Sequence, residues 1–135
     1  MTQNINFHFN NVVIVCGPVI IKDNKVLLNK HGESNLWKFP GGDITQASDD
    51  LETWAQKKVK EEMDLAVEII KALKPMVIWK NDEVILLFHY LAELKSETIK
   101  PAAYIREYGW HDINNLPSDC SPNIKPIIEE VINSK

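Results

Sequence analysis

Cysteine is scarce in this chain: its 135 residues include two, Cys16 and Cys120, which form no Cys-x-x-Cys pair. A disulfide framework is therefore not expected, and both residues should be reduced thiols of a cytoplasmic protein. Long apolar runs are also missing. Residues 12–21 form the longest run, which Gly17 and Pro18 interrupt and which is shorter than the about 20 residues that cross a bilayer. The first ten residues lack the features of a signal peptide, so neither a membrane span nor export is expected.

An excess of positive charge is absent as well. The sequence has 15 basic and 19 acidic residues, and its formal net charge is -4. Such a balance gives no general attraction for the phosphates of duplex nucleic acid. A small phosphorylated ligand remains compatible with it, because a divalent cation can join acidic side chains to phosphate oxygens. The length and the 44% hydrophobic content predict one domain over residues 1–135.

Several segments have the pattern of β-strands. Residues 12–28 consist of two aliphatic runs around a polar cluster at 22–25, and residues 75–90 repeat this arrangement around 80–83. Both segments are predicted to be strand hairpins. A further strand is predicted at 103–111, where aromatic and other side chains alternate.

Two segments have helical periodicity. The first covers residues 49–63 and begins with the acids Asp49, Asp50 and Glu52, which the positive end of a helix dipole favours. The second, residues 123–132, has isoleucine and valine along one face. Strands before and after a helix, with another helix at the end, predict an α+β or layered α/β/α domain.

The first helix has charged residues on its predicted apolar face. At about 100° per residue, Lys58 and Glu62 fall inside the apolar stripe and Glu61 falls beside Trp54. Buried charges are costly unless they are paired or bound to a cation, so a functional cleft is one interpretation. The alternative is an ion pair of Lys58 and Glu62 at the edge of a solvent-facing helix.

The loop before this helix favours the functional interpretation. Gly41 and Gly42 permit close approach of the backbone, and they follow the aromatic and proline stretch 37–40. Paired acids on a helix that follows such a loop suit a site for a metal and a phosphate.

These residues resemble the Nudix hydrolase family. Its sequence box has Gly, five residues, Glu, seven residues and then Arg-Glu-aliphatic-x-Glu-Glu-x-Gly-aliphatic, usually after a tryptophan and Pro-Gly-Gly. Residues 36–42 match the beginning closely, and residues 57–65 align with the helical half. The resemblance covers most of the chain and implies a Nudix-like α/β/α sandwich with a mixed central sheet, the helix 49–63 on one side and the C-terminal helix on the other.

The box is degenerate. Lys57 stands in place of Arg, Lys58 in place of the following Glu, and Asp64 in place of Gly; the first half is one residue longer, so that Asp49 falls at the first Glu. Asp49 and Lys57 retain the signs of the family's structural ion pair. A protonated lysine cannot bind magnesium, so the ammonium group of Lys58 would take the place of a metal ligand and supply a positive charge of its own.

The resemblance also implies the site residues. In the family, the acids at positions 58, 61 and 62 and a backbone carbonyl of the Gly-Gly loop hold divalent cations, which polarise a diphosphate and help to activate water. For this chain, Glu61, Glu62 and the carbonyl of Gly41 are the expected ligands of weakly bound Mg²⁺ or Mn²⁺, and Gly41, Gly42 and Lys58 are expected to contact the substrate. Glu61, Glu62 and Lys58 form the catalytic group. A further ligand could come from outside the helix, and the candidates are Glu83, Glu93 and, with most weight because the family often uses a late glutamate, Glu107.

Two functions follow from the resemblance. The first is metal-dependent hydrolysis of a nucleoside diphosphate linked to another moiety; the second is binding of a nucleotide or phosphorylated metabolite without turnover. Lys58 distinguishes them, and it is predicted to pair with Glu61 or Glu62 in the unliganded protein. Neither duplex nucleic acid nor a membrane is an expected partner, and a homodimer is an assembly that we consider.

Overall fold

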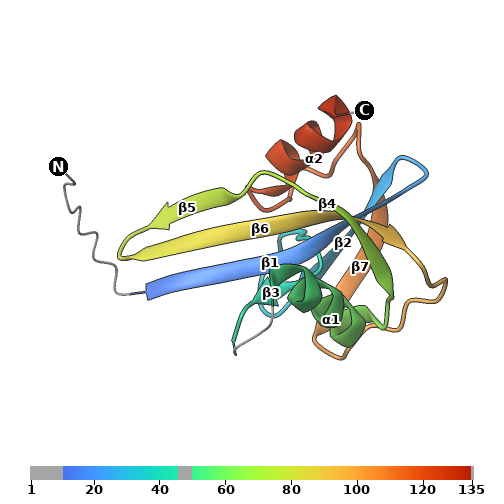
Figure 1. Ribbon diagram of the computed structural model, residues 1–135, viewed down its shortest axis with the longest axis horizontal. Helices are drawn as coiled ribbons and strands as arrows, with labels where there is room; N and C mark the ends of the chain where they lie inside the picture. Colours follow the sequence, from blue (N-terminus) through green and yellow to red (C-terminus); the bar gives the residue numbers. More distant parts are fainter. Residues whose placement is uncertain (1–10, 46–49, 135) are drawn as a thin grey trace.

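A seven-stranded mixed sheet forms the centre of the protein (Figure 1). The structure is a computed structural model that describes residues 11–45 and 50–134. The strands are β1 (Asn11–Lys22), β2 (Lys25–His31), β3 (Gly42–Asp43), β4 (Val67–Ala72), β5 (Met76–Lys80), β6 (Glu83–Leu94) and β7 (Ile105–Asp112). The main order is β4-β6-β1-β2-β7, while β3 pairs with β1 and β5 with β6.

The two predicted hairpins and the late strand are confirmed. β1 and β2 meet antiparallel at the pairs Ile21↔Val26 and Lys22↔Lys25, and the two residues between them, Asp23 and Asn24, both have positive φ. Tight hairpin turns need this backbone conformation, which Asp and Asn tolerate. β5 and β6 form the second hairpin.

Two strands were not predicted. β4 pairs antiparallel with β6, and the two-residue β3 pairs with β1. The sheet is mixed because β1 and β6, from separate hairpins, run parallel to each other over ten residue pairs.

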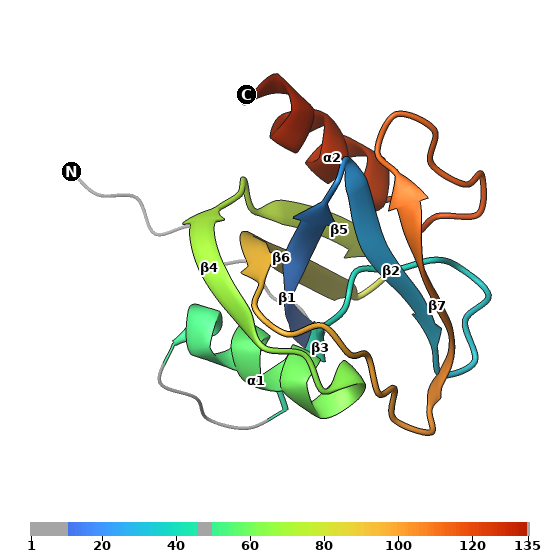
Figure 2. The same ribbon diagram turned by 90° about the vertical axis from the view of Figure 1, so that its right-hand side faces the viewer.

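The two helices cover opposite faces of the sheet, as predicted (Figure 2). α1 (Leu51–Met63) packs its residues Val59 and Met63 against one face, and α2 (Ile124–Asn133) packs three isoleucines and a valine against the other. Successive side chains of a strand point to opposite faces. Val19 and Ile20 of β1 accordingly belong to different core clusters.

The ends of α1 differ slightly from the prediction. Asp50 is the N-cap, since its side chain accepts a hydrogen bond from the backbone N–H of Thr53, while Asp49 lies outside the described residues. At the other end Asp64 takes the left-handed conformation with φ 56°, in which glycine is preferred. Its carboxylate lies 2.8 Å from the Lys60 ammonium. In the described part of the chain, no helix has both the length and the apolar character for a membrane span.

Candidate functional site

The Gly41-Gly42 loop lies directly on β1. A side chain at Gly41 would overlap the carbonyl oxygen of Cys16, and the φ of Gly41 is +124°, so this position requires glycine. Gly42 belongs to β3 and is the register partner of Cys16. The loop is therefore fixed to the middle of β1 by its backbone.

Glu62 connects α1 to this loop. Its Oε1 accepts a hydrogen bond of 2.8 Å from the backbone N–H of Gly41, and the residue is 1% exposed. Burial raises the pKa of Glu62 to about 7, although the Gly41 N–H and the Lys58 ammonium act in the opposite direction. The helical projection predicted that Glu62 is buried, and its buried side chain joins α1 to the glycine loop.

Lys58 pairs with Glu61, as predicted. The Lys58 Nζ lies 3.9 Å from Oε2 of Glu61, and the two side chains are 23% and 72% exposed. The Cε of Lys58 is also 3.4 Å from the point where a Cβ on Gly42 would stand. The ammonium group is therefore held close to both the acids and the glycine loop.

The structure places the other candidate acids in different surroundings. Glu107 lies 3.6 Å from the ammonium of Lys30, and Glu93 lies 3.5 Å from that of Lys95. Glu83 begins β6. Within residues 11–45 and 50–134, no three His, Cys, Asp or Glu side chains are grouped so that they could hold a metal ion, so Glu107 does not join Glu61 and Glu62 in this arrangement.

The donor set at Glu61 and Glu62 fits a cation that is shared with the substrate. Mg²⁺ takes about six oxygen ligands, and in phosphate-processing sites one or two carboxylates commonly hold it while phosphates and waters supply the rest. Glu61 is mostly exposed, and one oxygen of Glu62 is occupied by the Gly41 N–H. These residues fit Mg²⁺ together with a phosphorylated ligand, in competition with Lys58 for Glu61.

A cleft of about 700 Å³ opens beside the glycine loop. Ile85, Leu87 and His89 line it from β6, and their alternate spacing puts them on one face of the sheet. The loop contributes Gly41 and Gly42 to the lining. The volume is in the range of about 300–1,000 Å³ that is usual for small-molecule sites.

Comparison with known proteins agrees with the fold. The family model described as NUDIX domain matches residues 11–131. The chain belongs to the NUDIX family. No curated protein matches the sequence.

Solved structures of NUDIX hydrolases share the fold. A MutT NUDIX hydrolase from Burkholderia pseudomallei is 24% identical with a TM-score of 0.79, over 89% of this chain and 98% of that one. A NUDIX hydrolase from Nitrosomonas europaea is 18% identical with a TM-score of 0.79, over 91% and 90%. An ADP-ribose pyrophosphatase from Streptococcus suis is 20% identical with a TM-score of 0.63, over 89% and 87%.

His31, at the end of β2, is a residue of the NUDIX cleft whose role the sequence did not indicate. Its Nδ1 lies 2.8 Å from Oδ1 of Asn29, and Asn29 is fully buried. An amide oxygen can only accept, so Nδ1 carries the proton and Nε2 keeps a lone pair. Burial lowers the pKa of His31, the charges of Lys38 and Lys58 lower it further, and Asp43 raises it. His31 is therefore an oriented imidazole that lines the cleft and lies near enough to Lys58 for the ammonium to lower its pKa.

Tyr104 is a second residue whose position the sequence did not indicate. Burial raises its pKa, and the negative charges of Glu62 and Glu61 add to this effect. The segment that carries it crosses the end of α1, where the N–H of Ala102 donates to the carbonyl of Glu62. Only the pairing of this segment with α1, which no local pattern encodes, brings Tyr104 to the acids.

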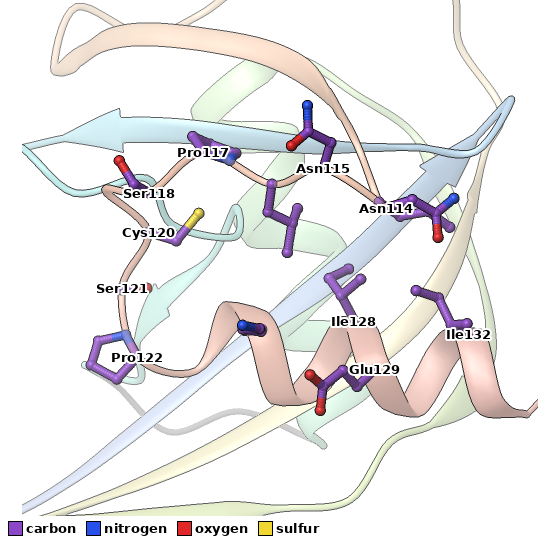
Figure 3. A pocket seen from close by; sticks show the side chains of 13 residues that line it. Asn114, Asn115, Pro117, Ser118, Cys120, Ser121, Pro122, Ile128, Glu129 and Ile132 are labelled. Atoms are coloured by element: carbon purple, nitrogen blue, oxygen red, sulfur yellow. The ribbon is translucent and has the colours of Figure 1, made fainter.

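A second hollow of about 670 Å³ lies between α2 and the preceding loop (Figure 3). Cys120, Ser121 and Glu129 are among the residues that line it. Of the residues that the sequence predicted for the site, none lines this hollow in the described structure. The cleft beside the glycine loop is lined by Gly41 and Gly42, whereas Lys58, Glu61 and Glu62 are not among its lining residues.

Proposed function

We propose that the protein is a metal-dependent hydrolase of the phosphoanhydride bond of a nucleoside diphosphate linked to another moiety, and that its weakened catalytic box binds the ion weakly and reduces the rate. The observation that carries this proposal is the contact of Glu62 with the Gly41 N–H, next to Glu61 and at the edge of a ligand-sized cleft. This contact keeps the acidic end of α1 against the loop on which a diphosphate would lie. Hydrolysis of such bonds is also what the name of the similar ADP-ribose pyrophosphatase states for that protein.

Each side chain has a distinct task in this proposal. Glu61 and Glu62 would hold Mg²⁺ or Mn²⁺ together with phosphate oxygens, and the ion would supply the positive charge that polarises the phosphoanhydride. Lys58 donates hydrogen bonds to the diphosphate and neutralises part of its charge. Gly41 and Gly42 allow the phosphates to approach the backbone.

His31 is the base that we assign to the attacking water. Its Nδ1–H is held by Asn29, so Nε2 is the atom that can take a proton. The lowered pKa keeps this nitrogen unprotonated at neutral pH. The proton passes from water to Nε2 while the water oxygen forms its bond to phosphorus and the bridging oxygen leaves with the other phosphate.

The proposal is tested by incubating the purified protein with nucleoside triphosphates, dinucleotides, ADP-ribose and nucleotide sugars, with Mg²⁺ or Mn²⁺, and measuring phosphate products. Calorimetry with the same ions should show weak binding to the wild type and none to the Glu61→Gln, Glu62→Gln double variant. Equal ion binding by both proteins would exclude these glutamates as the principal ligands. A panel without any product would refute hydrolysis.

A second function has support from one observation. The Lys58–Glu61 ion pair neutralises an acid without any metal, which suits a protein that binds a nucleotide or phosphorylated metabolite without turnover. In that case the same ligands would bind equally well with Mg²⁺ and with a chelator. Binding that needs the ion, accompanied by product, would favour the hydrolase.

A further inference from the structure

The pairing of β7 with β2 is irregular beside the cleft. β7 is the last strand in the main order of the sheet and lies along β2 (Figure 2). The register partner of Lys30 is Glu107, while that of His31 is Ile105, so Arg106 has no partner in β2. One extra residue in a strand is a β-bulge, and a bulge near a site commonly turns a side chain towards it. This bulge lies opposite His31, which lines the cleft.

The bulged residue, Arg106, contacts the loop of residues 33–36 that follows β2. Its Nη2 donates a hydrogen bond to the backbone carbonyl of Ser34. Its Nη1 and Nη2 each lie 3.4 Å from Oδ1 of Asn35. One planar guanidinium group therefore contacts two acceptors of the loop, an arrangement that the single ammonium of a lysine does not reproduce.

This loop is fixed to the rest of the protein at both ends and by Arg106. Before the loop, the N–H of Gly32 lies 3.3 Å from the carbonyl oxygen of Tyr104. After it, the N–H of Trp37 lies 2.9 Å from the carbonyl oxygen of Asp119. Between these two points, and among the residues that the structure describes, every hydrogen bond from the loop to another segment comes from Arg106. The position of the middle of the loop therefore depends on this one side chain.

The loop forms part of the cleft. Ser34 and Leu36 are among the lining residues, and Leu36 is 39% exposed, so it presents apolar surface there. A ligand that had to order this loop would bind more weakly, because the lost conformational freedom opposes binding. A loop that is already held in place avoids that loss.

We propose that Arg106 is a positioning residue of the cleft, which holds the 33–36 loop where Ser34 and Leu36 complete the lining before a ligand arrives. This inference rests on the proposed function to the extent that the ligand is a nucleoside diphosphate compound. In the described structure Arg106 is not among the lining residues, so it acts through the loop. Its loss should weaken binding and leave the chemical step unchanged, because His31 keeps its own contact with Asn29.

Binding of α,β-methylene-ADP with Mg²⁺ tests this role apart from turnover, since a carbon replaces the bridging oxygen and no phosphoanhydride bond is present. By calorimetry, Arg106→Gln should bind this ligand about tenfold more weakly than the wild type, because the ligand must then order the loop. With the best substrate of the panel, KM should rise by a similar factor while kcat stays within about twofold. Equal affinities of the wild type and Arg106→Gln, or no binding to the wild type, would overturn the inference.

Two variants separate the positioning of the loop from the charge of Arg106. Arg106→Lys keeps the positive charge but not the planar pair of donors, so it should still bind at least about threefold more weakly than the wild type. Lys125→Gln removes an exposed positive charge on α2 and should bind like the wild type. Wild-type affinity in Arg106→Lys would show that only the charge matters and would overturn the inference.

Nitrogen NMR relaxation of the free wild type covers the case in which Arg106→Gln does not fold. The backbone of residues 33–36 should be as ordered as that of β2, and in a folded Arg106→Gln it should be more mobile on the picosecond to nanosecond timescale. A mobile loop in the wild type would overturn the inference. Weaker binding in Arg106→Gln without hydrolysis of any diphosphate would refute the hydrolase alone, and hydrolysis with equal affinities would refute the role of Arg106 alone.

Discussion

The ionisation of Glu62 should make the stability of the protein depend on pH. Burial holds the pKa of this carboxyl at about 7 instead of the usual 4.5, a difference that corresponds to roughly 3 kcal/mol. The unfolded chain releases the proton near pH 4.5, while the folded protein keeps it until about pH 7. The contribution of Glu62 to the free energy of unfolding therefore falls as the pH rises through this window and stays low above it.

Denaturant unfolding of the wild type and Glu62→Gln between pH 4.5 and 8 measures this contribution. Glutamine can still accept the hydrogen bond from Gly41 but does not ionise, so the wild type should lose roughly 3 kcal/mol relative to the variant across the window. Glu129→Gln is the matched control, because Glu129 is an exposed acid on α2 and should leave the pH dependence unchanged. Parallel pH curves for the wild type and Glu62→Gln would refute the argument that Glu62 is buried against the loop.

Three further substitutions test the site. Lys58→Glu should lower the metal-free stability by roughly 0.5–1 kcal/mol through like-charge repulsion, and in calorimetry and product assays it should raise Mg²⁺ affinity and hydrolysis. Lys125→Glu, at an exposed position of α2, controls for the charge change, and unchanged affinity and activity in a folded Lys58→Glu would make Lys58 a peripheral residue. Gly41→Ala should destabilise the protein by more than about 2 kcal/mol in denaturant unfolding. The control Gly32→Ala, with open space around its Cβ position, should cost about 1 kcal/mol, and similar losses in the two variants would contradict the close packing of the Gly41-Gly42 loop. His31→Gln should lower kcat with little change in KM and remove the fall of kcat towards acid pH that protonation of His31 causes, and an unchanged pH–rate profile would exclude His31 as the base.

Local patterns in the sequence were sufficient to predict most of the fold. Alternating and aliphatic runs identified both hairpins, and helical periodicity identified both helices to within two residues among those described. β4 was missed because its pairing with β6 depends on residues distant in sequence, and Ile70 within it is 57% exposed. β3 consists of two residues, too few for a periodic pattern.

The helical projection also predicted part of the site. It placed Glu62 among the apolar residues of α1, and the structure buries this side chain; it placed Lys58 within reach of Glu61, and the two form an ion pair. It could not predict the hydrogen bond between Glu62 and Gly41, which are 21 residues apart, or the hydrogen bond between His89 and Asn123, which are 34 residues apart. Both contacts arise from the packing of a helix against the sheet. Metal binding at Glu107 stays a prediction, and in the structure this side chain pairs with Lys30.

The most direct test of the proposed function is the steady-state rate of phosphate release from the best substrate of the panel. With Mg²⁺ present, Glu62→Gln and the Glu61→Gln, Glu62→Gln double variant should have kcat at least about a hundredfold below the wild type, while Glu129→Gln, an exposed acid on α2, should match the wild type. A double variant as active as the wild type would contradict the assignment of hydrolysis to the acids of α1 at the Gly41-Gly42 loop.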